Sequence, residues 1–385
     1  MCLIIKDEAQ WLPGCLASIQ QIAGEIIVVD TGSKDESLTI AQQYGAKIFK
    51  FDWQDDFAAA RNFSLEQATG NWILVLDADE KISSQDHNHI INLIRQPATS
   101  PTAYKLLTRN YTNRNNLVGW QANPGDYPKE ESGCGWIPSI KVRLWSNHPQ
   151  IRFSYPVHEL VEPALERLDI EPLALPVVIH HYGKLDDAAA RKKGEKYFQI
   201  GWQKLESMDN NARIPLRELA IQAGMLGKFA EAAVLWQRFL DLDPKNCEAL
   251  LNLGTALFST GKIKQALAAV KKAAHIHPGL KEIRFNQALY ELHLGRAADA
   301  DKRIQRLLKK YPAYPAARFL QAAAHACHKG DKSGRQTFRQ LQDQSLDFTS
   351  EIIQIAGQEL SSTLARAGRT KYAEIIKKAT ADRLI

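Results

Sequence analysis

The 385-residue sequence has no uninterrupted apolar run near the roughly 18 residues that a membrane-spanning helix needs. Its first residues include Lys6, Asp7 and Glu8, where a secretory signal peptide would be apolar. The five cysteines are far apart and lack the close pairs of zinc and redox motifs. We therefore expect a protein of the reducing cytoplasm, with no disulfide framework and at most peripheral contact with membranes.

The charge is divided unevenly along the chain. Residues 1–180 hold 15 Lys and Arg against 22 Asp and Glu, a net charge of −7, whereas residues 181–385 hold 34 against 21, a net charge of +13. This division favours two modules. A basic module can attract nucleic acid, anionic lipid or an acidic acceptor, but the Lys and Arg between 302 and 310 lie at helical spacing and favour a solvated helix face. We expect no nucleic-acid partner.

The second half of the sequence repeats with a period of 34 residues. Three ladders show it: Pro244, Pro278 and Pro312; Gly227, Gly261 and Gly295; Ala232, Ala266 and Ala300. Apolar residues at helical spacing lie on both sides of each glycine, which predicts pairs of helices. This layout resembles the tetratricopeptide repeat, a scaffold of stacked helix pairs. We expect clear repeats over about 213–314, degraded or capping repeats over 315–385, and a leading helix over 186–208 that covers the other end.

The first half alternates short β-branched runs with amphipathic segments. Strands are predicted at 2–5, 25–29, 46–51 and 72–76, and helices at 10–20, 37–44 and 56–68. This alternation is typical of an α/β domain with a doubly wound, mostly parallel sheet. Residues 102–179 are strand-like and rich in loops. We place the boundary near Asp186, between a domain of residues 1–185 and a helical domain of residues 186–385.

Acidic residues follow three of the predicted strands. The segments that contain these acids are Lys6-Asp7-Glu8 after the first strand, Asp30 after the second and Asp77-Ala78-Asp79-Glu80 after the fourth. Ligands of open parallel sheets bind outside the carboxyl ends of the strands. A phosphate ligand would be repelled there unless a divalent cation or an arginine neutralised the acids. Oxygen ligands with phosphate favour Mg²⁺ or Mn²⁺ over zinc.

These stretches resemble the family 2 glycosyltransferases of the GT-A fold over roughly residues 2–183. The stretches that carry the resemblance are CLIIKDEAQWLPGCLASI, EIIVVDTGSKDES, FDWQDDFAAARNFSLEQATGNWILVLDADE and the later VHE and HHYG. The resemblance implies a Rossmann-like GT-A domain that binds a nucleotide-sugar donor, with UDP as the expected nucleotide. An Asp-x-Asp triplet alone is a weak signal, because acids after a strand are often turn formers. Here ARNFSLEQATG and a buried strand precede the triplet, which makes it a strong one.

On the nucleotide side, the resemblance implies that Asp30 hydrogen-bonds the base, with Lys6 and Asp7 beside it. Arg61 and Asn62 would line the nucleotide pocket, and a guanidinium suits phosphate geometry. Two structural alternatives remain open. Asp30 can cap the following helix, and Arg61 can form a surface pair with a nearby aspartate.

On the phosphate side, the resemblance implies that Asp77 faces the ribose and that Asp79 holds the metal. A late histidine often adds a metal ligand in such enzymes, and His181 is our first candidate, with His158 second. Imidazole is an acceptable ligand for Mn²⁺. The alternative for His181 is a half-buried histidine with a purely structural partner.

An inverting transfer needs a carboxylate that takes the proton of the acceptor. We expect Glu159, in the stretch PVHELV, to be this base. Asp126, Glu130 and Glu131 are alternatives, and Glu159 can instead form a structural ion pair.

The sequence therefore predicts a metal-dependent, inverting glycosyltransferase whose acceptor is a peptide, a protein or a saccharide. The repeats would bind that acceptor or a protein partner. The alternative is a catalytically inactive adaptor that acts through its repeats. A nucleotidyltransferase is disfavoured, because the first strand is followed by Lys6-Asp7-Glu8 and not by a glycine-rich basic loop. The donor sugar, the acceptor and the oligomeric state do not follow from the sequence.

Overall fold

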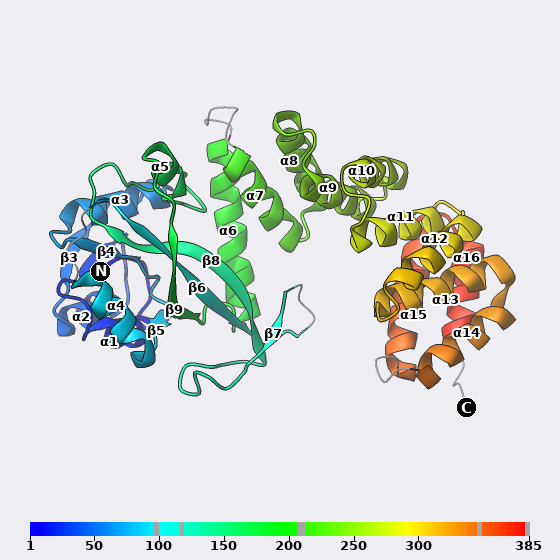
Figure 1. Cartoon of the computed structure of the whole chain (residues 1–385), viewed down its shortest axis with the longest axis horizontal. Helices are drawn as coiled ribbons and strands as arrows, with labels where there is room; N and C mark the ends of the chain where they lie inside the picture. Colours follow the sequence, from blue (N-terminus) through cyan, green and yellow to red (C-terminus); the bar gives the residue numbers. More distant parts are fainter. Residues whose placement is uncertain (96–99, 116–118, 206–212, 345–348, 382–385) are drawn as a thin grey trace. The chain divides into compact units, whose positions relative to one another are not determined.

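The computed structural model describes residues 1–95, 100–115, 119–205, 213–344 and 349–381 (Figure 1). The chain divides into two compact units, residues 1–208 and residues 209–385. No helix in the described ranges combines the length and the apolar character needed to cross a bilayer.

The first unit begins with three parallel strands, β1 (Cys2–Ile5), β2 (Ile27–Asp30) and β3 (Lys47–Lys50). The connecting helices are α1 (Leu12–Ile19), α2 (Ser37–Gln43) and α3 (Phe57–Gln67). Side chains of β1 and β2 enter a separate apolar core on each face, with Leu3 and Val28 on one side and Cys2 and Ile27 on the other. Burial on both faces explains why these strands are apolar throughout. The predicted order of strands and helices is confirmed here.

Beyond β1 the sheet becomes mixed. Its remaining strands are β4 (Trp72–Leu74), β5 (Glu80–Ile82), β6 (Ala103–Thr112), β7 (Gln121–Ala122), β8 (Gly135–Ser146) and β9 (Leu173–His181), with short helices η1 (Ser84–Asp86), α4 (His87–Ile94) and α5 (Glu162–Arg167). The order is β4-β8-β6-β9-β5, and a parallel bridge between Cys2 and Val75 joins β1 to the end of β4.

The expectation of a mostly parallel sheet holds for β1 to β4 and for the β6–β9 pair, but not for the other strand pairs. β8 is antiparallel to both β4 and β6, and β5 is antiparallel to β9. The cause lies partly in the acidic turn after β4, where the Glu80 N–H donates to the Asp77 carbonyl oxygen at 3.0 Å and the chain leaves the parallel direction. The turn places both aspartates of the Asp-x-Asp triplet at the edge where the strands change direction.

The helix predicted to lead the repeats, α6 (Asp187–Leu205), belongs to the first unit. The Tyr197 ring packs edge-on against Phe57 with 4.8 Å between centroids, and Lys204 Nζ donates to the Gln54 carbonyl oxygen at 3.3 Å. The expected boundary near Asp186 therefore differs from the observed division after residue 208. Tyr197 thus packs on the first residue of α3, a partner that helical periodicity does not identify. The end of the predicted segment, residues 206–208, lies outside the described residues.

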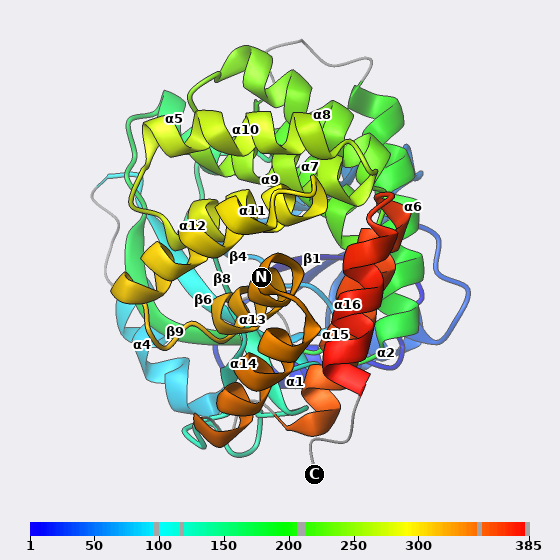
Figure 2. The ribbon, with the colours of Figure 1, turned by 90° about the vertical axis from the view of Figure 1, so that its right-hand side faces the viewer.

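The second unit consists of helix pairs (Figure 2). They are α7 (Arg213–Met225) with α8 (Phe229–Leu242), α9 (Cys247–Ser259) with α10 (Ile263–Ile276), α11 (Lys281–His293) with α12 (Ala297–Lys310), α13 (Pro315–Lys329) with α14 (Asp331–Gln344), and α15 (Ser350–Arg366) with α16 (Thr370–Ala381). Gly227, Gly261 and Gly295 turn the chain within the first three pairs at φ of 75°, 78° and 84°, which glycine adopts at least cost. The three ladder alanines are at most 1% exposed. The predicted repeat is confirmed.

The last pair, α15 and α16, runs side by side (Figure 2) and returns to the third pair. Tyr372 Oη donates to the Gly295 carbonyl oxygen at 3.1 Å, and Arg369 Nε donates to the His293 carbonyl oxygen at 3.1 Å. Thr363 Oγ1 lies 2.9 Å from His293 Nε2. These contacts tie the end of the described chain to the turn between α11 and α12. The linking residues 345–348 of the predicted capping segment lie outside the described residues.

Candidate active site

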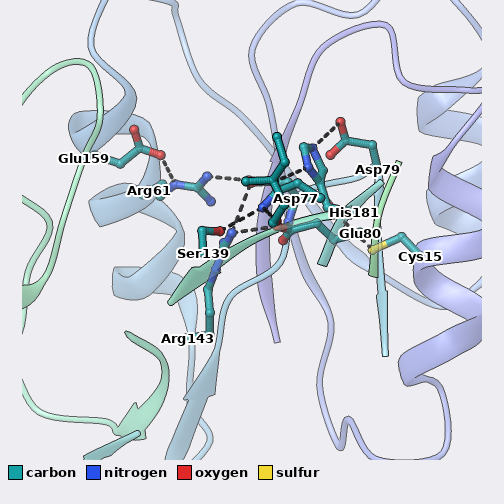
Figure 3. A network of polar contacts seen from close by, with 11 residues as sticks. Cys15, Arg61, Asp77, Asp79, Glu80, Ser139, Arg143, Glu159 and His181 are labelled. Carbon is teal, nitrogen blue, oxygen red and sulfur yellow. Dashed lines mark hydrogen bonds and ion pairs between the residues drawn. The ribbon is translucent and has the colours of Figure 1, made fainter. Parts of the chain in front are cut away.

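Arg61 joins two acids that are far apart in the sequence (Figure 3). It lies on α3, where Asp56 caps the helix by accepting from the Ala59 N–H at 2.8 Å. Arg61 Nη2 lies 2.5 Å from Asp77 Oδ1, and Arg61 Nε lies 2.6 Å from Glu159 Oε1. The Arg61 side chain is 7% exposed and the Asp77 side chain is 38% exposed, so a buried arginine joins the two acids, in place of the surface pair left open above. The pair brings Asp77 and Glu159 to one place.

A second arginine supports the same aspartate. Arg143 on β8 pairs with Glu80 at 2.6 Å and with Asp77 Oδ2 at 3.5 Å. Burial raises the pKa of Asp77, but the charges of Arg61 and Arg143 outweigh it and hold that pKa well below its usual range. The sequence alone did not identify Arg143 as a residue of this site. It lies in the strand VRLW, where an arginine in an otherwise apolar run needs a buried partner.

Asp79 faces His181 across the end of the sheet (Figure 3). Asp79 Oδ2 lies 3.3 Å from His181 Nε2, and Asn110 Oδ1 lies 2.8 Å from His181 Nδ1. A Cβ at Gly183 would collide with Asp79 Oδ2, so this glycine leaves the space in which the two side chains meet. Burial lowers the pKa of His181, but the hydrogen bond and charge of Asp79 outweigh it and leave the pKa above its usual value.

The Asp79–His181 pair fits a hard divalent cation only in part. Adjacent ligands of an octahedral Mg²⁺ lie about 3 Å apart, close to the observed separation of the two donor atoms. No three His, Cys, Asp or Glu side chains within the described ranges are arranged to hold a metal ion, so His158 does not complete a site with this pair. A divalent cation bound here would therefore have these two side chains as its protein ligands, and its remaining ligands would have to come from a bound diphosphate and water.

The predicted base-contacting residues lie at the ends of β1 and β2. Asp30 is buried and accepts from the Ser33 N–H at 2.9 Å. This bond closes a turn and does not cap the helix, because α2 begins only at Ser37 with Glu36 as its N-cap. The exposed Asp7 has φ of 55° and accepts from the Lys34 N–H at 2.7 Å, and its own N–H donates to Ser33 Oγ at 3.0 Å. Lys6 is exposed beside it. These bonds fix the two strand ends against each other, and within the described ranges no hydrogen bond or ion pair joins Lys6, Asp7 or Asp30 to Asp77 or its partners.

Asn62 holds the segment that leads to Glu159. Its Nδ2 donates to the Phe153 carbonyl oxygen at 3.0 Å, and its Oδ1 accepts from the Phe153 N–H at 2.8 Å. Asn62 is predicted to line the nucleotide pocket, but both of its amide atoms bond to the main chain of Phe153. These bonds position the segment before Glu159. His158, half-buried with φ of 57°, precedes Glu159 in this segment.

The alternative bases lie around Arg109 on β6. Arg109 makes two bonds of 2.6 Å to Asp126 and a 3.3 Å contact to Glu131 Oε1, so both acids are committed to one guanidinium. Glu131 also accepts from the Gly125 N–H. Glu130 Oε2 is buried and has no hydrogen-bond partner among the described residues. Glu159, by contrast, is joined to Asp77 through Arg61, which favours it among the four.

Lys193 on α6 contributes a cation that the sequence analysis did not identify. Its Nζ lies 3.4 Å from Glu8 Oε1, and its side chain is 50% exposed. Burial lowers the pKa of Lys193, but neighbouring charges outweigh it and leave that pKa raised; in order of size they come from Tyr197, Asp79, Glu8 and Asp77. Lys193 lies within a run of basic residues, ARKKGEK, and such runs are usually solvated helix faces. The sequence therefore offers no sign that Lys193 lies close to these acids.

A small cavity of about 40 Å³ lies beside the ion network. Arg61, Asp77, Arg143 and Glu159 line it together with Lys141. This volume holds about a water molecule or two. The site thus combines clustered acids, two buried arginines and an acid–histidine pair at the carboxyl end of β4.

Residues 1–140 match the family model described as glycosyl transferase family 2. They are a family 2 glycosyltransferase domain. Arg61, Asp77 and Asp79 lie within the match, whereas Glu159 and His181 lie beyond it in the same compact unit. Residues 218–280 and 285–334 match the tetratricopeptide repeat model, so the glycosyltransferase domain is followed by tetratricopeptide repeats.

Relatives carry the same two descriptions. A TPR repeat-containing protein of Synechococcus elongatus is 40% identical over 48% of this chain and 41% of its own length. The SPbeta prophage-derived glycosyltransferase SunS of Bacillus subtilis is 33% identical over 24% of this chain and 22% of its own length. The chain therefore spans less than half the length of these relatives. The crystal structure of MamA is 18% identical and covers 40% of this chain and 92% of its own, with a TM-score of 0.35.

Proposed function

We propose that this protein transfers a sugar from a nucleotide donor, with UDP as the nucleotide, to an acceptor hydroxyl or thiol with inversion at the anomeric carbon. The acceptor is a peptide, a protein or a saccharide, and the repeats bind that acceptor or a partner. The observation that supports this proposal best is the junction of Asp77, Arg61 and Glu159 beside the Asp79–His181 pair, within and next to a family 2 glycosyltransferase domain.

Asp79 and His181 would hold Mg²⁺ or Mn²⁺. When bound, such an ion supplies Lewis-acid stabilisation of the charge that develops on the departing diphosphate. Asn110 Oδ1 accepts a hydrogen bond from the His181 Nδ1–H and fixes the ring, while the missing side chain of Gly183 keeps the space between the two ligands. Lys193 adds a positive charge on the side of Glu8. Lys6, Asp7 and Asp30 remain our candidates for the base-binding end of the donor site.

Glu159 would take the proton of the acceptor. Arg61 binds only its Oε1, and Oε2 has no hydrogen-bond partner in the part of the chain that the structure describes. One oxygen is thus positioned by the guanidinium while the other can face the acceptor. The same guanidinium also binds Asp77, so Arg61 fixes the positions of Glu159 and Asp77 relative to each other.

The substitution Glu159→Gln tests this assignment. Glutamine can still accept from Arg61, so nucleotide binding should stay unchanged, while transfer should fall by about a hundredfold or more because the proton acceptor is lost. Transfer would be measured as incorporation of labelled sugar, and nucleotide affinity by calorimetry.

Glu162→Gln serves as the matched control. Glu162 lines the same small cavity, and its Oε1 accepts from the Val142 N–H at 3.3 Å. Its variant should keep transfer near the wild-type rate. If Glu159→Gln also keeps that rate, the carboxylate is a structural ion pair, and the base must be sought at Glu130.

A further inference from the structure

A cavity in the repeats is lined mostly by charged residues. Its volume is about 590 Å³. It is formed by α10, by the turn after it, and by α11 and α12, with six of its thirteen residues on α12. α10 and α12 are the second helices of neighbouring pairs, whose order is visible in Figure 2. We call this cavity the basic groove.

The walls of the basic groove carry an excess of unpaired positive charge. The cations concerned are Lys271, Arg284, Arg296, Lys302, Arg306 and Lys310. Within the described ranges, no carboxylate lies within 4 Å of the charged nitrogens of these six side chains. All except Arg284 are exposed. Cations that repel one another in one cavity leave it poised for an anionic ligand.

One further cation of the groove is already neutralised. Arg303 binds Glu291 through two bonds, Nε to Oε2 at 2.8 Å and Nη2 to Oε1 at 2.6 Å, and a third bond of 2.9 Å joins it to Gln287 Oε1. The Glu291 carboxylate is 6% exposed. This buried pair forms a fixed part of the groove that is independent of any ligand, and the six unpaired cations surround it.

We propose that the basic groove binds an acidic peptide segment of a partner or acceptor protein. Guanidinium groups such as those of Arg284 and Arg306 bind carboxylates through two parallel hydrogen bonds. Leu307, Pro278 and Tyr311 add apolar surface to the same cavity, against which peptide side chains can pack. The inference concerns binding alone and does not require the transferase activity.

The mixture of charges in the groove favours a peptide over a densely charged polyanion. Asp299 lies among the cations with no cationic partner within 4 Å in the described residues, and Glu291 lies in the wall. A polymer with a charge at every unit would bring some of its phosphates or sulfates against these acids. A peptide carries carboxylates at intervals, and its neutral N–H groups can donate to Asp299 between them.

Fluorescence anisotropy on the full chain tests the proposal. The probe is a short labelled peptide in which Glu and Asp alternate with Ser, and its counterpart carries Gln and Asn in place of the acids. We expect the acidic peptide to bind and the neutral one to bind at least about tenfold more weakly, with an affinity that falls as salt is added.

Two double variants locate the binding. Lys271→Glu/Arg306→Glu reverses one cation of the groove on each of α10 and α12. Lys272→Glu/Lys309→Glu makes the same change in charge at exposed residues of the same two helices that do not line the groove. We expect the first variant to lose at least about tenfold in affinity and the second to stay within about threefold of wild type. Circular dichroism confirms that both variants keep their helices.

Three outcomes would overturn the proposal. Equal losses in the two double variants would show that only the summed charge of the repeats attracts the peptide. Equal affinity for the acidic and neutral peptides would remove the charge recognition. Tighter binding of heparin than of the peptide, lost in the groove variant alone, would assign the groove to an anionic polysaccharide.

Discussion

At the scale of single residues, the Asp79–His181 pair depends on a position that has no side chain. Asp79 Oδ2 and His181 Nε2 both border the space that a Cβ at Gly183 would occupy. Asp79 would therefore have to move if that Cβ were present. The sequence motif HHYG contains this glycine, but its spacing does not show that it lies against an aspartate about a hundred residues earlier.

Gly183→Ala should weaken metal-dependent nucleotide binding by at least about tenfold, the range expected when the support of a metal ligand is disturbed. Calorimetric titration of UDP in the presence of Mn²⁺ measures it. Gly24→Ala is the control, because a Cβ at Gly24 meets nothing within 4 Å. Wild-type affinity in the Gly183 variant would show that the pair does not hold the metal.

Several site residues could be predicted from the sequence because each follows a strand. Asp77 and Asp79 follow β4, and this buried strand fixes where the two aspartates lie. Arg143 could not be predicted in its role, because its partner Glu80 is reached only through the β4–β8 pairing. Asn62 was assigned to the nucleotide, yet both its amide atoms bind the Phe153 main chain. Residue type alone does not distinguish a side chain that binds the nucleotide from one that holds the main chain in place.

At the scale of elements, α6 is the part of the chain whose role differs most from expectation. Helical periodicity predicts the helix, but not the unit on which it packs. Tyr197 packs against Phe57 and Lys193 pairs with Glu8, so the helix closes the glycosyltransferase domain. The mixed sheet has a similar origin, since the direction of β5 and β8 is decided by turns and pairings distant in sequence.

Lys193→Ala should raise the dissociation constant of UDP with Mn²⁺ about threefold to tenfold, as expected for the loss of about 1 kcal/mol from a half-exposed charge pair. The loss should shrink as salt is added. Lys192→Ala, at an exposed position on the same turn of α6, should bind like wild type. Identical affinities of the two variants would mean that Lys193 does not face the donor.

At the scale of the whole molecule, the two units have separate cores and opposite charge. The repeats could be predicted from three ladders of identical residues, because a period of 34 reports a local unit that is copied. The boundary between the two units could not be predicted, because it depends on which apolar core the helix α6 packs against. The division predicts that donor chemistry and partner binding are separable.

Deletion of residues 209–385 should leave hydrolysis of the nucleotide sugar within about twofold of the full chain, since every residue of the proposed donor site lies in the first unit. Incorporation of labelled sugar into macromolecular acceptors should fall. Circular dichroism of the shortened chain verifies that it folds. Unchanged incorporation would reduce the repeats to a stabilising role.

The most direct test of the account is a calorimetric titration of nucleoside diphosphates, UDP first, into the full chain with Mn²⁺ and then with a chelator. We predict saturable binding with Mn²⁺ that weakens at least about tenfold in the chelator and equally in Asp79→Asn. Equal affinity with and without the metal would contradict the role of Asp79 and His181. If no nucleoside diphosphate binds under either condition, the protein is an inactive adaptor and not a transferase.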